Sequence, residues 1–229
     1  MEGYIPRSCL DYLEQGILKN GFYLLYDDND QLYTAFCDLS IEPGSAWTLV
    51  VSWVTAKYKE LPYFRNKAFS EDAPINEDNP NFQIYRQTFD RMISIREHST
   101  HWRATCNVQQ YTTRIDYQDY LRGKFSDFDI MNYDGGLSCQ PVEYVNIIGN
   151  VSGSGTTVGF WQSSGSYFLH IDSSDTGCDF LPLANPRVDY FGYYGDGLSS
   201  EFRCSQYESY TTQWWFGGYL EEKRSSVAE

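Results

Sequence analysis

The sequence predicts an α+β fold with a disulfide-tied N-terminal unit, a central, mostly antiparallel sheet and a loop-rich C-terminal region. The first observation is composition: the 229 residues include 20 Tyr, 6 Trp and 18 Gly, which favours strands and loops over a helical bundle. The second is a pattern of paired strands near the N-terminus. The third is a set of six cysteines at wide spacings, which indicates three disulfides and an oxidising compartment.

The N-terminal unit is predicted to be a helix followed by a hairpin. The helix begins with Ser8 as its N-cap and an Asp three residues later. The two hairpin strands are residues 22–26 and 31–38. Residues 27–30 between them, three Asp and one Asn, resemble a metal loop, but their position between two strands favours a turn. A disulfide between Cys9 and Cys37 would tie the helix to the end of the hairpin.

Further along the chain, the sequence predicts more strands, a long loop and one helix. Residues 46–54 form the central strand, and the polar, proline-punctuated residues 57–80 form a loop. Apolar side chains then recur at intervals of three and four, which predicts an amphipathic helix over residues 81–96. A glycine- and serine-rich turn is expected at residues 149–155. The remaining predicted strands are residues 101–106, 111–117, 142–148, 156–161 and 167–171.

The length of the chain suits one domain. We expect residues 1–220 to form a single domain and residues 221–229 to form a disordered tail. No segment has the apolar length of a transmembrane helix, and the first residues lack the basic and apolar pattern of a signal peptide. Because the disulfides imply export, we expect this chain to be a mature fragment of a secreted protein.

The charge balance of the chain restricts the kinds of partner that it can bind. With 17 basic and 31 acidic residues, the formal net charge is −14, which argues against nucleic acid and against anionic membrane surfaces. The acidity permits cationic partners, calcium ions or mineral surfaces. Simple solubility is the alternative explanation for it.

Three short motifs lie in the first fifty residues, namely Asn20-Gly21-Phe22-Tyr23, Tyr33-Thr34-Ala35-Phe36-Cys37-Asp38 and Trp47-Thr48-Leu49-Val50. Together they resemble the opening of a fibrinogen-like (fibrinogen C-terminal) domain. The intelectin branch is the most similar variant, and the His-Trp-Arg sequence that begins at His101 extends the similarity. The resemblance implies a fibrinogen-like fold, an extracellular location, a ligand pocket in the C-terminal part and an Asp-rich calcium loop near the last disulfide.

The resemblance also implies how the cysteines pair. The expected disulfides are Cys9–Cys37, Cys106–Cys139 and Cys178–Cys204. The family has counterparts of the first and the last of these, and the middle pair consists of the two cysteines that remain. Fifteen pairings are formally possible for six cysteines, and no Cys or His spacing indicates a zinc site.

Residues 172–179 are the strongest candidate for a metal site. Asp172, Asp175 and Asp179 offer three carboxylates, with serine and threonine hydroxyls between them. Calcium takes six to eight oxygen ligands, so such a loop suits it, and the calcium loop of fibrinogen-like domains has a comparable position. Calcium is therefore the candidate cofactor. The alternative is an acidic surface turn closed by Asx hydrogen bonds.

Aromatic residues and glycines crowd residues 188–216. Aromatic rings suit the apolar faces of sugars or a quaternary ammonium group, and the resembled family has its ligand pocket in this part of the chain. The candidate ligand-binding residues are Tyr190, Tyr193, Tyr194, Trp214 and Trp215. The alternative is that these rings pack in the core.

Nothing in the sequence marks a catalytic site. The chain has three His, and neither a Gly-x-Ser-x-Gly elbow nor a phosphate loop is present. His170 lies near Asp172 and Ser173, but adjacent residues at a strand end point to different faces, so no triad geometry follows. A pair of carboxylates that hydrolyses glycosidic bonds is an alternative, since such pairs come together only in the fold. We predict that the protein is not an enzyme.

Two hypotheses about function follow. The first is an extracellular, secreted recognition module of lectin type, which binds a glycan or an extracellular protein through its C-terminal loops with the help of calcium. Asn150 begins an N-glycosylation acceptor, which agrees with secretion. The second is an acidic structural component of an extracellular or skeletal organic matrix, because residues 42–50 resemble invertebrate matrix variants of fibrinogen-like domains.

Overall fold

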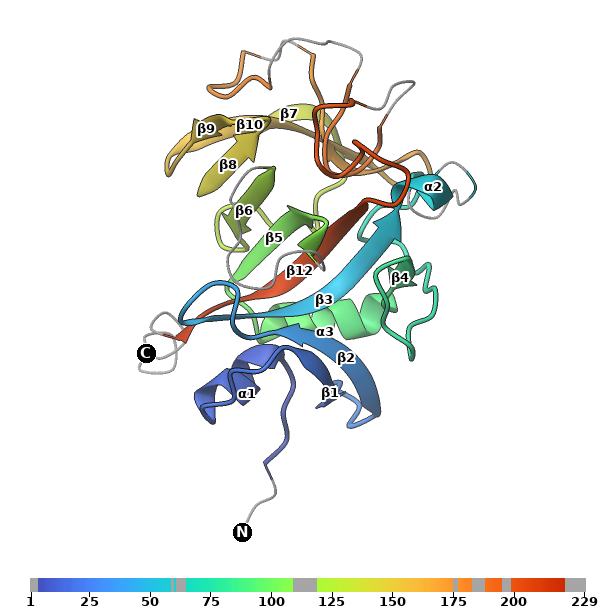
Figure 1. Cartoon of the computed structure of the whole chain (residues 1–229), viewed down its shortest axis with the longest axis vertical. Helices are drawn as coiled ribbons and strands as arrows, with labels where there is room; N and C mark the ends of the chain where they lie inside the picture. Colours follow the sequence, from blue (N-terminus) through green and yellow to red (C-terminus); the bar gives the residue numbers. More distant parts are fainter. Residues whose placement is uncertain are drawn as a thin grey trace.

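The computed structural model describes residues 4–58, 60, 65–108, 119–174, 177–182, 188–194 and 199–220. The helices are α1 (Cys9–Glu14), α2 (Thr55–Tyr58) and α3 (Phe89–Glu97). The strands are β1 (Gly21–Tyr26), β2 (Leu32–Asp38), β3 (Ser45–Val54), β4 (Ile84–Arg86), β5 (His101–Cys106), β6 (Tyr120–Lys124), β7 (Gly135–Val142), β8 (Tyr144–Ile147), β9 (Asn150–Ser152), β10 (Thr156–Ser163), β11 (Tyr167–Ile171) and β12 (Thr211–Tyr219). The described part of the chain is therefore β-rich, with few helices (Figure 1).

The strands form two sheets, and their pairings are antiparallel. The larger sheet has nine strands in the order β1-β2-β3-β12-β5-β6-β8-β9, with β4 paired to β3. The smaller sheet has the order β11-β10-β7 and lies at the end of the molecule that carries β8 and β9 (Figure 1). Helix α3 crosses the larger sheet behind β3 (Figure 1). The prediction of a central, mostly antiparallel sheet is confirmed.

The N-terminal unit matches its prediction. Ser8 and the Asp at the third helical position form a capping box at the start of α1, and β1 pairs with β2 as a hairpin. The turn of that hairpin is closed by Asp27, whose carboxylate accepts hydrogen bonds from the backbone N–H groups of Asn29 and Gln31 at 2.9 Å. The disulfide between Cys9 and Cys37 is confirmed. The helix is therefore covalently tied to the end of the hairpin.

The C-terminal region contains a central strand that the sequence analysis did not predict. Strand β12 pairs with β3 on one side and with β5 on the other. Its residues from Thr211 to Gly218 are buried, because both faces of the sheet are covered. Trp214 belongs to one core cluster and Trp215 to another, since neighbouring side chains of a strand point to opposite faces. The run therefore lacks the polar and apolar alternation by which half-buried strands are recognised.

Two of the three expected disulfides are wrong. The observed pairs are Cys106–Cys204 and Cys139–Cys178, instead of Cys106–Cys139 and Cys178–Cys204. Sequential pairing fails because Cys106 ends β5 in the larger sheet, whereas Cys139 lies on β7 in the smaller sheet. A bridge between Val158 of β10 and Phe180 brings Cys178 next to the smaller sheet instead. Three disulfides are nevertheless present, as is typical of proteins that fold in an oxidising compartment.

The helix predicted over residues 81–96 begins later than expected. Residues 84–86 form β4, which pairs with β3, and the helix begins at Phe89 after Thr88. The Thr88 hydroxyl caps the helix by accepting a hydrogen bond from the backbone N–H of Arg91. The fully buried Arg86 holds the preceding loop, because its guanidinium donates to the carbonyls of residues 67, 68 and 71. The first residues of this segment therefore form a strand, although their apolar spacing is that of a helix, because they pair with β3.

The remaining strand predictions have mixed outcomes. The strands predicted at residues 101–106 and 167–171 are confirmed as β5 and β11, and the strand at 156–161 is the first part of β10. The strand predicted at 142–148 is divided between the end of β7 and β8, and the expected turn at 149–155 contains β9. The predicted strand 111–117 and the predicted tail 221–229 lie outside the described residues. No helix of the described residues has the length and hydropathy needed to cross a membrane.

Candidate functional site

A cluster of three ligand-forming side chains lies at the end of β11. His170 is on that strand, Asp172 follows it, and Asp189 comes from the segment that runs beside it. The bridge between Ile171 and Tyr190, with N···O distances of 3.0 and 2.9 Å, sets this register. One ligand atom of each of the three side chains lies within 4.8 Å of the others. Among the described residues, this is the group arranged to hold a metal ion.

The hydrogen bonds of His170 leave one ring nitrogen available to a ligand. Its Nδ1 lies 2.8 Å from the carbonyl oxygen of Phe168. A carbonyl oxygen only accepts, so Nδ1 carries the proton and Nε2 carries the lone pair. The ring is 2% exposed, and this burial lowers the pKa of His170 to about 4. The imidazole is therefore neutral at physiological pH, the form that binds metals.

The two carboxylates of the cluster face each other in a partly buried place. Burial and then the charge of Asp172 raise the pKa of Asp189 to about 7, although the backbone N–H of Ser173 donates to Asp189 at 3.3 Å. Asp172 accepts a hydrogen bond from the backbone N–H of Ser174 at 2.7 Å. The Ser173 hydroxyl oxygen is buried and has no hydrogen-bond partner among the described residues. A cation would relieve the repulsion between the carboxylates, and a proton shared between them would do so as well.

The donor set fits a transition-metal ion better than calcium. One imidazole nitrogen with two carboxylates suits Zn²⁺ or Mn²⁺, whereas calcium prefers oxygen ligands alone. Of the three predicted calcium ligands, Asp172 is in the cluster and Asp175 lies outside the described residues. The Asp179 carboxylate instead accepts hydrogen bonds from the backbone N–H and the hydroxyl of Thr157, at 3.1 and 2.7 Å. The predicted calcium ligands therefore do not come together at one site among the described residues.

Three half-buried aromatic rings surround His170 on the same side of the small sheet. Trp161 of β10 is the cross-strand partner of His170, and the ring of Tyr167 lies 5.4 Å from Trp161 and 6.0 Å from His170. Tyr193 lies 4.9 Å from Tyr167 and 5.6 Å from His170, and the guanidinium of Arg65 covers its ring at 5.3 Å. Trp161 and Tyr167 are therefore the rings best placed to stack on a ligand.

A glycine allows the segment of Tyr193 to approach β11 closely. A Cβ atom built on Gly192 would lie 1.9 Å from the carbonyl oxygen of Leu169. Any other residue at this position would push the two backbones apart. Gly192 therefore positions Tyr193 and Asp189 against the strand that carries His170.

Four of the five predicted ligand-binding aromatics are buried. Tyr190 and Tyr194 are each 1% exposed, and Trp214 and Trp215 are completely buried. The Trp214 indole N–H donates to the carbonyl of Phe191 at 2.9 Å, so that even its polar edge is occupied. Core packing, the alternative left open by the sequence, accounts for these four rings. The fifth predicted residue, Tyr193, is half-buried and lies at the cluster.

Several residues of the candidate site were not predicted. His170 was considered only as a member of a catalytic triad, and Trp161, Tyr167 and Asp189 were not singled out. The sequence contains a partial signal, because Trp161 and His170 lie on two predicted neighbouring strands. Asp189 has no local signal, since only the bridge at Ile171 brings it to the site. The predicted glycosylation residue Asn150 is half-buried on β9, and its side-chain amide donates to the carbonyl of Leu181 at 3.1 Å.

A second cluster of charged groups is part of the large sheet. The guanidinium of Arg103 donates to the carboxylates of Asp38 and Glu42, the latter at 2.9 Å. The same guanidinium lies over the rings of Trp47 and Trp215, at 4.5 and 5.1 Å from their centroids. All five side chains are at most 4% exposed. The Arg103 charge is thus paired within the cluster, although its Nε atom has no hydrogen-bond partner among the described residues, and the burial of all five side chains shields the cluster from ligands.

The sequence comparisons identify no relatives. A scan of the chain against models of known protein families finds no match, and a search of curated proteins finds no similar sequence. The function therefore has to be argued from the fold and from the cluster around His170.

Proposed function

We propose that this protein is an extracellular recognition module of lectin type, which binds a glycan at the surface around His170. The observation that carries the proposal is the position of Trp161 and Tyr167 beside a cluster of one imidazole and two carboxylates. Aromatic rings offer flat apolar surfaces to the C–H faces of a sugar, and carboxylates accept hydrogen bonds from its hydroxyl groups. The site thus combines both kinds of contact that a saccharide needs.

A divalent cation is part of the proposal. His170, Asp172 and Asp189 would hold it, and the bound ion would supply positive charge and free coordination positions for hydroxyl oxygens. The Nδ1–H donation to Phe168 fixes the ring orientation of His170, the usual way in which a second hydrogen bond orients a metal-binding histidine. The proposed metal is therefore of the zinc or manganese type, in place of the calcium expected from the sequence.

Kinship with fibrinogen-like domains is also proposed. It is supported by the antiparallel sheet and by the Cys9–Cys37 disulfide, which ties the first helix to the hairpin next to the central strand. The pairs Cys106–Cys204 and Cys139–Cys178 differ from those that the resemblance implies. The proposed extracellular location is supported by the three disulfides.

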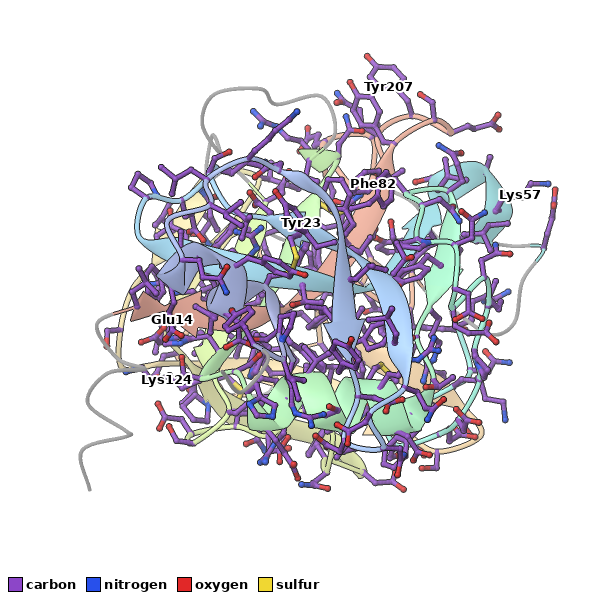
Figure 2. All side chains as sticks on the ribbon, turned by 90° about the horizontal axis from the view of Figure 1, so that it is seen from below. Glu14, Tyr23, Lys57, Phe82, Lys124 and Tyr207 are labelled. Carbon is purple, nitrogen blue, oxygen red and sulfur yellow. A yellow bond between two sulfur atoms is a disulfide. The ribbon has the colours of Figure 1, made fainter. Side chains whose placement is uncertain are left out.

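A glycan array tests the proposal. The wild-type protein should bind a subset of glycans and lose that binding in the presence of a chelator. Trp161→Ala and Tyr167→Ala should each weaken binding about tenfold, the typical effect of one stacked ring. Tyr207→Ala is the matched control, because Tyr207 is 57% exposed and projects from the surface (Figure 2). Binding that is unchanged in the Trp161 and Tyr167 variants would refute this site.

An acidic matrix component is the second candidate function, and the formal net charge of −14 favours it. Such a protein would adhere to calcium carbonate through many surface carboxylates and would show no saccharide preference. Two results together would favour this candidate over a lectin. The protein would adsorb to calcium carbonate in the presence of competing sugars, and it would bind no glycan on the array.

A further inference from the structure

A groove of about 740 Å³ lies between the tip of the β1–β2 hairpin and the start of α3. In Figure 1 the β1–β2 hairpin and β4, which precedes α3, lie on the same side of the molecule. The groove is formed by different elements from those that carry His170, so it is separate from the proposed glycan site. Its lining includes five acidic side chains and one arginine, namely Asp27, Asp72, Glu77, Asp78, Asp90 and Arg91. The groove is therefore strongly negative.

The acidic side chains of the groove differ in whether they already have a hydrogen-bond or ion-pair partner. Asp27 closes the hairpin turn, Asp72 accepts a hydrogen bond from the backbone N–H of Phe89 at 2.8 Å, and Asp78 pairs with Arg91 at 2.8 Å. Glu77 and Asp90 have no ion pair with another described residue. These two carboxylates are the ones most available to a cationic ligand.

A buried hydroxyl gives an independent indication of a ligand. Tyr33 lines the groove and is only 3% exposed, yet its hydroxyl oxygen has no hydrogen-bond partner among the described residues. A buried hydroxyl without a partner costs free energy, and native proteins rarely leave one unpaired. The guanidinium of Arg91 lies over the Tyr33 ring at 4.5 Å, which shows that this part of the groove already accommodates a cation.

Apolar side chains run along the same groove. Leu24 and Leu32 are 50% and 49% exposed and belong to its lining, together with Phe89. The apolar surface can contact the methylene groups of a ligand, and the carboxylates can bind a positively charged group on the same ligand. The five carboxylates form no metal-ligand group like that around His170 within the described residues. The groove therefore fits an extended organic cation better than a metal ion.

We propose that this groove binds an alkylammonium group, supplied either by a free polyamine or by a lysine side chain of a peptide. The ammonium group donates hydrogen bonds to Glu77, Asp90 and the Tyr33 hydroxyl, while its methylene chain lies against Leu24 and Leu32. Attraction by the groove charge and pairing of the buried hydroxyl act together, because one ammonium group supplies both a positive charge and N–H donors.

Calorimetric titration with spermidine and with Nα-acetyl-lysine amide tests the proposal. Wild-type protein should bind at least one probe, and the double variant Glu77→Gln, Asp90→Asn should bind it about tenfold or more weakly, the usual effect of losing charge-assisted hydrogen bonds. The matched control is the double variant Glu201→Gln, Glu208→Gln. It removes the same charge at exposed positions outside the groove and should bind like the wild type.

Tyr33→Phe separates a ligand role from a packing role. Because the hydroxyl has no described protein partner, its removal should leave the melting temperature unchanged or slightly raised, yet it should weaken binding several-fold. Binding of spermidine alone identifies a polyamine site, and binding of the lysine probe as well identifies a site for peptides. Equal affinity in the groove and control variants would show attraction by net charge alone and would overturn the proposal, as would absence of binding by both probes.

Discussion

Replacement of Arg103 tests how the large sheet is held together. The substitution Arg103→Met keeps the length of the side chain and removes its charge. It leaves Asp38 buried without its counter-ion and leaves Glu42 with Arg122 at 3.7 Å, and removal of one partner of a buried ion pair costs about 3–5 kcal/mol. Loss of the cation–π contacts with Trp47 and Trp215 adds about 1 kcal/mol for each ring. We expect a loss of about 5–7 kcal/mol in the free energy of unfolding.

Urea unfolding at pH 7, followed by tryptophan fluorescence, measures this loss. At roughly 2–4 °C per kcal/mol for a chain of this size, the melting temperature in a separate thermal scan should fall by at least about 10 °C. A triple variant that adds Asp38→Asn and Glu42→Gln removes the uncompensated charges, so it should be more stable than Arg103→Met alone. The reasoning is refuted if the single variant lies within about 1 kcal/mol of the wild type, or if the triple variant recovers no stability.

Three further predictions concern acid stability, strand packing and the disulfides. Burial would raise the pKa of Glu143, but a hydrogen bond from His101 and nearby basic side chains lower it to about 2. This carboxylate therefore stabilises the fold above about pH 4.5, and its contribution should disappear between pH 4.5 and 2, so Glu143→Gln should flatten the acid limb of a stability–pH curve. Gly217→Ala would place a Cβ atom 2.0 Å from a carbonyl oxygen of β3 and should destabilise the protein by roughly 1–3 kcal/mol in urea unfolding, whereas Gly136→Ala, with open space around it, should be neutral. Peptide mapping without reduction should recover Cys106–Cys204, and a Cys106–Cys139 peptide would contradict the structure.

The parts of the fold that could be predicted from sequence are those that depend on nearby residues. The capping box of α1, the hairpin turn at Asp27 and the Cys9–Cys37 disulfide join residues at most 28 positions apart. Each is specified by residue types that have few alternatives over such a short distance. Strong local patterns therefore gave the correct N-terminal unit.

The parts that could not be predicted depend on distant contacts. Strand β12 is recognisable only from its partners β3 and β5, because burial on both faces removes the alternation of polar and apolar residues. Cys106 and Cys204 are separated by 98 positions, so nothing local indicates that they pair. The start of α3 was misplaced because pairing of residues 84–86 with β3 is a tertiary contact.

The candidate site shows the same division. Tyr193 and Asp172 could be singled out from residue type, whereas Asp189 is brought to the candidate site by the bridge beside β11, which joins two separate segments. Trp214 and Trp215 were misassigned because a ring that stacks on a sugar and a ring that packs in a core are the same residue type. Burial distinguishes the two, and burial follows from the topology of the sheet.

The position of β12 has a consequence for biosynthesis. A nascent chain that ends before Thr211 carries both β3 and β5 without the strand that separates them, so each presents a row of unpaired amide and carbonyl groups. The sheet therefore closes only after residues 211–219 have emerged from the ribosomal exit tunnel, and until then the unpaired edges of β3 and β5 can associate with other chains. Premature termination in this region would be expected to yield aggregates and chaperone clients rather than a smaller working protein.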